Sequence, residues 1–268
     1  MENENDTYEI YAIKYASTPR RRRDNFVPAD PHDDASMPMD FYVWLLKSPQ
    51  RAILIDTGFG QEMAIRRDRT LLRCPIEALA AVGVQPGDIA DVVITHLHYD
   101  HAGNLGKLPN ARFHVQDGEV DYATGRCMCF KPMRHAYAVE DVVQLIQHLY
   151  ADRVVFHQGD SQLAPGVQLM LMGGHTKGLQ SVRVKTRRGW VVIASDASHY
   201  YDNMMEGRAF PIVYSMADML AGHRRLLAAA DSPDHVIPGH DPQVLQRYPL
   251  LEGDATGVAL LHLAPKAH

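Results

Sequence analysis

The sequence predicts a mixed α/β fold in which strands outnumber helices. Short apolar runs, such as residues 91–95 and 190–194, have the length and the Val and Ile content of buried strands. Residues 139–150 instead carry apolar side chains at a helical period. The chain has 268 residues, of which 46% are hydrophobic and 22% charged, so it can bury the core of one large domain. We therefore expect residues 1–268 to form a single domain.

Three strands are expected in the N-terminal part. Residues 8–15 alternate apolar and polar side chains, as in a strand with one buried face. Residues 37–46 and 51–55 are apolar runs separated by Ser48-Pro49-Gln50, which is typical of two strands joined by a tight turn. The polar segment 20–34 contains a run of four arginines. We interpret this segment as a solvated surface loop, with contact to an anionic partner as the alternative.

Helices and strands are expected to follow one another in the rest of the chain. Residues 60–73 are charged and show no clear period, whereas residues 75–83 begin with Pro and end with Gly, which predicts a helix. A further helix over 216–230 leads into a closing strand before His240. Residues 117–138 mix Met, Cys, Tyr and His and are expected to form a wall above the site. The other predicted strands cover residues 112–115, 154–156, 167–171 and 181–185.

The charge and the termini restrict the partners. A formal net charge of −5 gives no overall basic field, so we expect no nucleic-acid partner. The chain lacks a run of 18 apolar residues, and its acidic start, Met1 to Asp6, does not resemble a secretion signal. A cytoplasmic protein without membrane contact is therefore expected. The three cysteines, Cys74, Cys127 and Cys129, are predicted to be free thiols rather than a thiolate metal site or a disulfide framework.

A dense set of metal ligands follows the predicted strand 91–95. Three imidazoles and one carboxylate occur within the six residues His96-Leu97-His98-Tyr99-Asp100-His101. Each is a first-choice ligand for zinc or a similar ion, and the carboxyl end of a buried strand is where open α/β sheets place their sites. His96 and His98 can point the same way and share one metal, whereas Asp100 and His101 suit a second. The alternative, a polar loop that happens to be rich in histidine, does not account for this density.

The pattern His-x-His-x-Asp-His, followed by Ala102-Gly103-Asn104, resembles the signature of the metallo-β-lactamase superfamily. The resemblance implies three further ligands in a fixed order. Matching residues are His175 in a Gly-His-Thr context, Asp196 at the end of a predicted strand, and His240 in a Pro-Gly-His turn. The resemblance covers roughly residues 40–245 and implies an αββα sandwich, in which two sheets pack face to face with helices outside.

This resemblance implies a site for two metal ions. One ion is expected to bind His96, His98 and His175, and the other Asp100, His101 and His240, with Asp196 between them. Nitrogen and oxygen ligands suit zinc but also admit iron, manganese or cobalt. Two divalent ions about 3.5–4 Å apart would lower the pKa of a shared water to near 7, which predicts hydrolysis.

Two nearby residues refine this expectation. The redox flavodiiron branch of the superfamily commonly has Glu where this chain has His98, so a hydrolase is favoured. Asp56, in Asp56-Thr57-Gly58, is expected to orient a ligand histidine, with a plain turn as the alternative.

Within the superfamily, the chain is most similar to the N-acyl homoserine lactonase branch. It shares the short form, Asp-Ala-Ser after the bridging Asp, and Gly-His-Asp at the last ligand. Secreted β-lactamases, glyoxalase II enzymes and tRNA-processing ribonucleases match less well in export signal, C-terminal length or charge. Those lactonases usually have a Tyr three residues after the bridging Asp, and a second His near the Gly-His-Thr motif. These positions are His199 and Leu179 here.

Because of these departures, more than one side chain is a candidate for contact with the substrate. Either His199 donates a hydrogen bond in place of the Tyr, or Tyr200 or Tyr201 turns into the site; a structural role for His199 is the alternative. Asp100 is expected to relay a proton to the leaving alkoxide. An acyl chain would need an apolar groove, for which the candidates are Met37, Met39, Phe41, Met204, Met205 and Phe210.

The predicted function is therefore a two-metal hydrolase that opens a lactone ring, first of all that of an N-acyl homoserine lactone, and so acts in quorum quenching. The alternatives are a hydrolase of another lactone, ester or phosphoester, and a non-catalytic metal-binding protein. The expected partner is a small lactone or ester. The sequence leaves the oligomeric state open, and a homodimer is one of the assemblies it allows.

Overall fold

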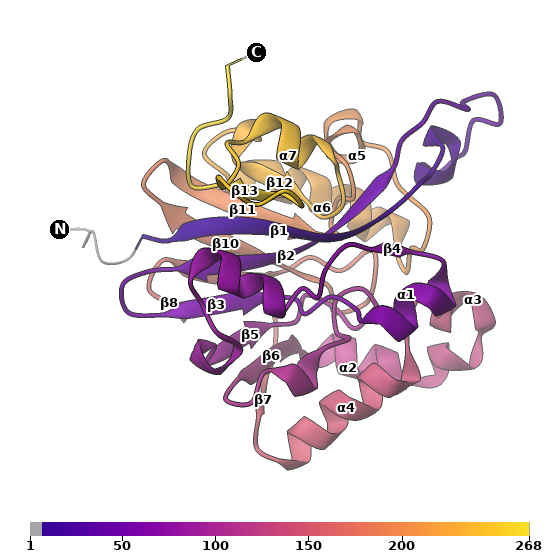
Figure 1. Cartoon of the computed structure of the whole chain (residues 1–268). Helices are drawn as coiled ribbons and strands as arrows, with labels where there is room; N and C mark the ends of the chain where they lie inside the picture. The colour runs from indigo at the N-terminus through magenta and orange to yellow at the C-terminus, as the bar shows by residue number, and fades with distance from the viewer. Residues whose placement is uncertain (1–6, 268) are drawn as a thin grey trace.

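Two β-sheets form the centre of the computed structural model, which describes residues 7–267 (Figure 1). The first sheet has the order β13-β1-β2-β3-β5-β6-β7, with β4 paired to β1, and the second has the order β12-β11-β10-β9-β8. The strands of the first sheet are β1 (Glu9–Thr18), β2 (Met39–Lys47), β3 (Ala52–Ile55), β4 (Thr70–Leu71), β5 (Asp91–Val93), β6 (Arg112–Gln116), β7 (Val154–His157) and β13 (Val258–Leu260). Those of the second are β8 (Ser161–Ala164), β9 (Val167–Leu171), β10 (Gln180–Thr186), β11 (Gly189–Ser195) and β12 (Val236–Pro238). The acidic N-terminal stretch used above to predict the absence of a secretion signal lies outside the described residues.

The first sheet is apolar on both faces, which explains its position in the middle of the fold. In β2, Trp44 and its alternate neighbours pack with residues of the second sheet, such as Val182 and Ile193. Phe41 and the residues alternating with it pack into the other core, which includes Leu145 from an outer helix. Side chains of a strand alternate between its two faces, so a strand buried on both reads as a continuous apolar run. This is the reason that residues 37–46 are apolar almost throughout.

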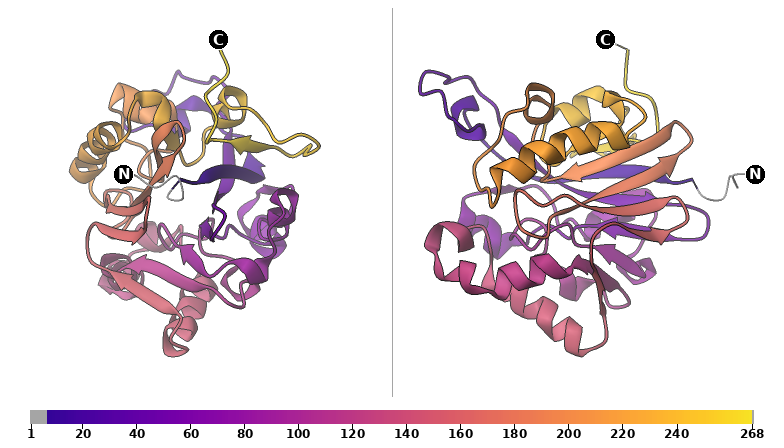
Figure 2. Two further views of the ribbon diagram at one scale, coloured as in Figure 1. Left: turned by 90° about the vertical axis from the view of Figure 1, so that its left-hand side faces the viewer. Right: turned by 180° about the vertical axis from the view of Figure 1, so that it is seen from behind.

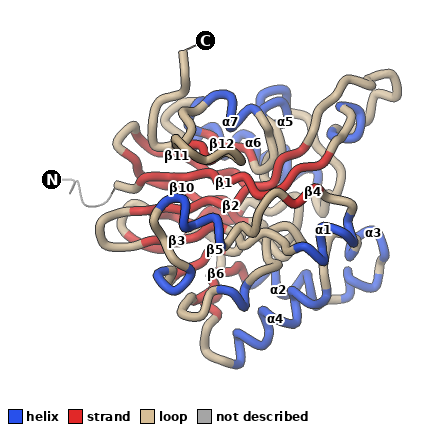
Figure 3. The backbone as a smooth tube through the Cα atoms, in the orientation of Figure 1, coloured by secondary structure: helices blue, strands red, loops and turns tan. Residues whose placement is uncertain are grey.

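Helices cover the outer faces of the two sheets, as Figures 2 and 3 show from different sides. In Figure 3 the strands, in red, lie between helices, in blue, on either side. The predicted αββα sandwich is therefore confirmed. The helices are α1 (Gln61–Arg67), α2 (Asp117–Thr124), α3 (Lys131–Arg134), α4 (Val139–Tyr150), α5 (Tyr201–Glu206), α6 (Met216–Ala229) and α7 (Gln243–Arg247). Within residues 7–267, no helix combines the length and the apolar character that crossing a bilayer requires.

Several short elements differ from the predictions. The helix expected over 75–83 is a 3₁₀ helix over Glu77–Val82, and Gly83 ends it in the left-handed region with φ +70°. Helix α1 lies in the segment for which the sequence shows no clear period. The pattern is weak because only Ala64 of its seven residues is buried. Strands β8 and β13 and helices α5 and α7 were not predicted; each has only three to six residues, too few for a clear period.

The strand directions bring several loops to one edge of the molecule. β3, β5, β6 and β7 are parallel to one another, and β11 is parallel to β12. β9 runs in the same direction as β11, because both are antiparallel to β10. The loops that follow β5, β9, β11 and β12 therefore leave at the carboxyl ends of their strands, where open α/β sheets place their sites.

Candidate metal centre

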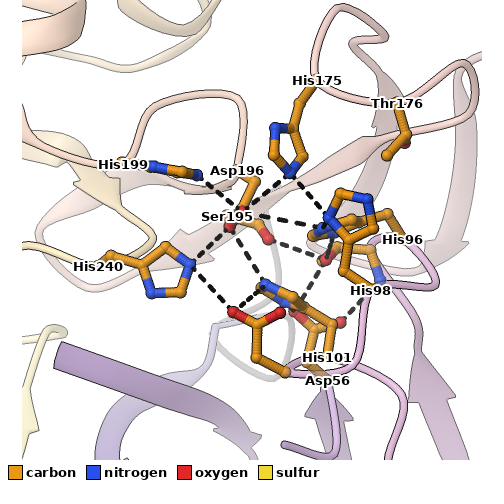
Figure 4. Close-up of polar contacts among 12 residues, drawn as sticks. Asp56, His96, His98, His101, His175, Thr176, Ser195, Asp196, His199 and His240 are labelled. Atoms are coloured by element: carbon orange, nitrogen blue, oxygen red, sulfur yellow. Dashed lines mark hydrogen bonds and ion pairs between the residues drawn. The ribbon is translucent and has the colours of Figure 1, made fainter. Parts of the chain in front are cut away.

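These four loops carry all seven predicted metal ligands, and the structure brings the seven side chains together. Figure 4 labels six of them, all except Asp100. The loop after β5 supplies His96, His98, Asp100 and His101, and the loops after β9, β11 and β12 supply His175, Asp196 and His240. All seven are buried, and Asp100, at 8% exposure, is the most accessible.

One group of donor atoms lies around His98. The Nε2 atoms of His96 and His175 each lie 3.0 Å from His98 Nδ1. Asp196 Oδ2 lies 3.2 Å from His175 Nε2 and 3.8 Å from His96 Nε2. Four ligands about 2.0–2.1 Å from a tetrahedral zinc ion would be about 3.3 Å apart. The spacing of these four atoms therefore fits a single ion.

The second group uses the other oxygen of Asp196. Asp196 Oδ1 lies 3.0 Å from His240 Nε2 and 3.3 Å from His101 Nε2. Asp100 Oδ2 lies 3.6 Å from His101 Nε2 and 3.8 Å from His240 Nε2. The buried atoms His101 Nε2 and Asp196 Oδ1 have no hydrogen-bond partner, although they lie close together. Buried polar atoms without a partner are rare, so donors that face a common point in this way fit a bound cation.

The charge state of the cluster follows from burial and from the two carboxylates. Burial and the neighbouring imidazoles hold the pKa of His96 and that of His98 well below the usual value, so both rings are neutral, as metal ligands must be. Burial opposes the charged form of His101 too, but the carboxylates of Asp196, Asp100 and Asp56 raise its pKa well above the usual value. Burial likewise opposes ionisation of Asp196, but His240 and His101 hold its pKa well below the usual range. The Asp196 carboxylate is therefore charged and attracts a cation.

Asp56 holds one of the predicted ligands from behind. Its Oδ2 accepts a hydrogen bond from His101 Nδ1 at 2.7 Å and one from the Thr95 hydroxyl at 2.8 Å, and its Oδ1 accepts the Thr95 amide at 2.8 Å. His101 Nε2 is therefore left to face the second group. This hydrogen bond is the one expected of a residue that orients a ligand histidine. His240 is oriented in the same way, because its Nδ1 donates to the backbone oxygen of Asp40 at 2.9 Å.

Glu119, which the sequence analysis missed, connects two of the ligand loops. Its Oε1 accepts the Leu97 amide at 2.9 Å and the Tyr137 hydroxyl at 3.0 Å, and its Oε2 accepts the Thr176 hydroxyl at 2.5 Å and the Gly178 amide at 3.2 Å. Leu97 lies between His96 and His98, and Thr176 follows His175. Glu119 is in the first turn of α2, where acidic residues are common for other reasons, so no sequence signal distinguished it.

The structure also brings His199 to the cluster, beside Asp196. His199 Nε2 lies 2.9 Å from Asp196 Oδ2, and the ring stacks on Phe210 with the centroids 3.7 Å apart. Burial lowers the pKa of His199 to about 3, so the ring is neutral and Nε2–H donates to the carboxylate.

Tyr200, in contrast, does not face the site. Its buried hydroxyl lies 3.3 Å from the backbone oxygen of Pro38 and 3.5 Å from that of Met37, and the ring belongs to the hydrophobic core. Tyr201 is also buried, with Arg247 over its ring at 3.8 Å. Residue 200 is the N-cap of α5, and this position directs both rings into the packing around the helix. The catalytic role considered for Tyr200 is therefore corrected to a core role.

A pocket opens over the cluster, and its lining differs from the expected apolar groove. Of the six apolar candidates, only Met39 lines it. Phe41 packs against His240 and Phe210 against His199, so both lie behind ligands or their neighbours. Met204 is buried in the core between the sheets, and Met205 is 58% exposed elsewhere. The remaining lining includes Arg20, Arg67, Arg69, Tyr99, His135 and Ile212.

Comparisons with known proteins relate both the sequence and the fold of this chain to metal-dependent hydrolases. The sequence model of the Metallo-beta-lactamase superfamily matches residues 42–240. An N-acyl homoserine lactonase of Bacillus cereus is 28% identical over 178 residues, which are 60% of this chain and 65% of that protein. A probable metallo-hydrolase of Mycobacterium tuberculosis is 24% identical over 233 residues, with coverage of 76% and 72%. The crystal structure of a quorum-quenching N-acyl homoserine lactone lactonase matches with a TM-score of 0.74 and 25% identity, covering 91% of this chain and 95% of that one.

Proposed function

Because the chain belongs to the metallo-β-lactamase superfamily, we propose that it is a metal-dependent hydrolase that opens a lactone or a closely related carboxylic ester. The observation that carries this proposal is the position of Asp196, which presents one oxygen to each of two groups of donor atoms. The similarity to curated lactonases, of whose length the match spans 65%, supports the substrate class. N-acyl homoserine lactones are accordingly the first substrates to test.

The residues of the cluster fit two divalent ions, and zinc is the metal that we propose. We assign His96, His98 and His175 to one ion and Asp100, His101 and His240 to the other, with Asp196 between them. Two such ions would lower the pKa of a water molecule and polarise the substrate carbonyl. Asp56 and the Asp40 carbonyl fix the Nδ1 protons of His101 and His240, so that each Nε2 faces the site.

The protein's own groups would handle the protons of the reaction. Hydrolysis breaks the bond between the carbonyl carbon and the ring oxygen, and the leaving alkoxide needs a proton. Asp100 is the most accessible of the ligands and lines the pocket, so we assign to its carboxyl the relay of that proton. His199 is neutral and lines the same pocket, and its Nε2–H either holds Asp196 in place or donates to the substrate oxygen.

The test is metal analysis of the purified protein together with a substrate panel of N-acyl homoserine lactones, simple lactones and aryl phosphates. We expect two metal ions per chain and turnover of at least one lactone, which is lost on chelation and restored by zinc. Turnover of aryl phosphates alone would replace the lactonase with a phosphoesterase. Full metal occupancy without any turnover would favour the non-catalytic metal-binding alternative. A single domain over residues 1–268 and a cytoplasmic location stay predictions.

A further inference from the structure

Three arginines that line the pocket over the cluster donate hydrogen bonds only to neutral groups among the described residues. Arg20 donates to the backbone oxygen of Asp24 and contacts Met39 Sδ. Arg67 donates to the backbone oxygens of His135 and Tyr137.

The third, Arg69, donates to the hydroxyls of Tyr99 and Thr18 and to the backbone oxygen of Asp68. All three side chains are half-buried. Within residues 7–267 none of the three therefore forms a salt bridge, although Glu140 and Asp141 interact electrostatically with Arg67.

Neighbouring arginines of the same segments are neutralised. Arg21 and Arg23 pair with Asp34 at 2.8 and 2.6 Å, and Arg22 pairs with Asp33 at 3.1 Å. Arg66, next to Arg67, pairs with Glu62 at 2.8 Å and with Glu140 at 2.9 Å. In both segments the arginines that face away from the pocket have acidic partners and those that line it do not. Whether an arginine has an acidic partner therefore depends on whether it lines the pocket, and not on the composition of the surrounding sequence.

Two of these guanidinium groups are held in place by the residue next to a metal ligand. Tyr99 precedes Asp100, and its hydroxyl accepts Arg69 Nε at 3.0 Å. The guanidinium carbon of Arg67 lies 4.6 Å from the centre of the Tyr99 ring. A guanidinium fixed by stacking and hydrogen bonds loses little freedom when it binds a carboxylate or phosphate in bidentate fashion. The pocket therefore presents pre-organised cations beside the predicted reaction centre.

The positive character continues beyond His135, which lines both this pocket and an adjacent hollow. The hollow is also lined by Lys131, by Arg134, which donates to the backbone oxygen of Met128, and by Arg66 and Glu140, which pair with each other. The chain as a whole has a net charge of −5, so this concentration of cations opposes the overall balance. A local field of this kind attracts anions of low molecular weight.

We propose that the substrate carries an anionic group, a carboxylate or a phosphate, which binds Arg20, Arg67 and Arg69 while its lactone or ester carbonyl lies over the metal centre. This proposal rests on the hydrolase function proposed above and selects among its substrates. A neutral N-acyl homoserine lactone offers these cations no charge. We therefore expect it to be a poorer substrate than an anionic lactone of similar size.

The experiment compares γ-butyrolactones that differ only at the γ position, using the full-length, metal-loaded protein. One bears a carboxylate, one a phosphooxymethyl group, and one the neutral isopropyl group, which matches the carboxylate in shape. We expect kcat/KM to be about tenfold or more higher for one of the anionic lactones, as hydrogen bonds between charged groups imply. The preferred lactone distinguishes a carboxylate from a phosphate.

Substitution of single arginines tests their part in this preference. We expect Arg67→Gln, Arg69→Gln and Arg20→Gln to lower kcat/KM on the anionic lactone more than on the isopropyl lactone, so that the ratio of the two values falls. Arg21→Gln is the matched control, because Arg21 belongs to the same run as Arg20 but pairs with Asp34 on the surface. Arg20 forms no hydrogen bond to the loop 135–137, so its variant also remains informative if Arg67→Gln disturbs that loop.

The outcomes separate the two proposals. Equal rates of the wild-type protein on the anionic and neutral lactones would overturn this inference and leave the hydrolase function intact. No turnover of any lactone or ester would overturn the hydrolase function, and binding of succinate, measured by calorimetry, would then decide the inference. Affinity for succinate that is about tenfold weaker in the arginine variants than in Arg21→Gln would support it. Unchanged affinity would overturn it.

Discussion

Replacing Glu119 with Gln should loosen both histidine loops of the first donor group. The carboxylate accepts four hydrogen bonds, from Leu97, Tyr137, Thr176 and Gly178. An amide keeps only one acceptor oxygen, so two of the four donors lose their partner. A buried donor without an acceptor costs about 1–3 kcal/mol, which gives about 2–6 kcal/mol for two. Burial raises the pKa of Glu119, so the neutral amide also removes a charge-burial cost, and we expect a loss of about 2–4 kcal/mol.

Two measurements check this expectation. Guanidinium denaturation of the metal-loaded variant gives the change in the free energy of unfolding. Competition with a chelator gives metal affinity, which we expect to fall about 10–100-fold, because residues that orient metal ligands have effects of that size. The control is Glu140→Gln on α4, which removes an exposed carboxylate paired with Arg66. We expect it to change the free energy of unfolding by no more than about 0.5 kcal/mol.

A Glu119→Gln protein with the stability and metal affinity of the wild type would refute this reasoning. It would mean that the two loops hold their conformation without the shared carboxylate. A loss of stability with unchanged metal affinity would limit the role of Glu119 to the fold.

Three further predictions concern Asp196, His199 and Asp141. Asp196→Asn keeps one carbonyl oxygen, so elemental analysis should find close to one metal ion per chain instead of two. His199→Phe keeps a ring to stack on Phe210 but loses the donor to Asp196, so kcat/KM should fall about tenfold or more without loss of metal or stability. Burial raises the pKa of Asp141 from 3.8 to about 7, and its Oδ2 has no hydrogen-bond partner. Since the folded protein binds this proton more tightly than the unfolded chain, stability is full below the unfolded pKa and is lost as the pH rises towards 7. Asp141→Asn should therefore gain about 2–4 kcal/mol at pH 8 and little near pH 4, as measured by denaturation at both pH values.

One specific result would contradict each of these three predictions. Two tightly bound ions in Asp196→Asn would exclude Asp196 as the shared ligand. Wild-type activity of His199→Phe would leave His199 as a structural residue beside the cluster. An Asp141→Asn variant with the same stability gain at both pH values would show that the ionised carboxylate carries no burial penalty.

The sequence predicts the elements whose side chains repeat with a clear period. The helix over 139–150 has the predicted bounds, because its apolar face follows the helical repeat over three turns. The pairing of residues 37–46 with 51–55 was also predicted, and β2 and β3 are antiparallel neighbours. Short surface elements such as α1 were missed, because a seven-residue helix with one buried side chain carries almost no pattern.

The sequence predicts those residues of the candidate site that belong to a recognisable motif. All seven proposed ligands meet in the structure because each follows a strand whose direction places its carboxyl end at the same edge. Glu119 was not predictable, since its partners are 18 to 59 residues away in the chain. The same holds for Arg20, which belongs to a run that was predicted to be a solvated loop. Only the folded chain shows that Arg20 lines the pocket while Arg21 to Arg23 pair with acids nearby.

The donor atoms of the cluster come from both sheets. Four ligands follow β5 of the first sheet, and the other three follow β9, β11 and β12 of the second. Cations bound there would add a link between the two halves of the sandwich, which at this edge are also joined by polar contacts such as that of Thr95 Oγ1 with Ser195 Oγ at 2.8 Å. Removal of the metal should then loosen the sandwich first at this edge, and amide exchange should quicken first in the four ligand loops.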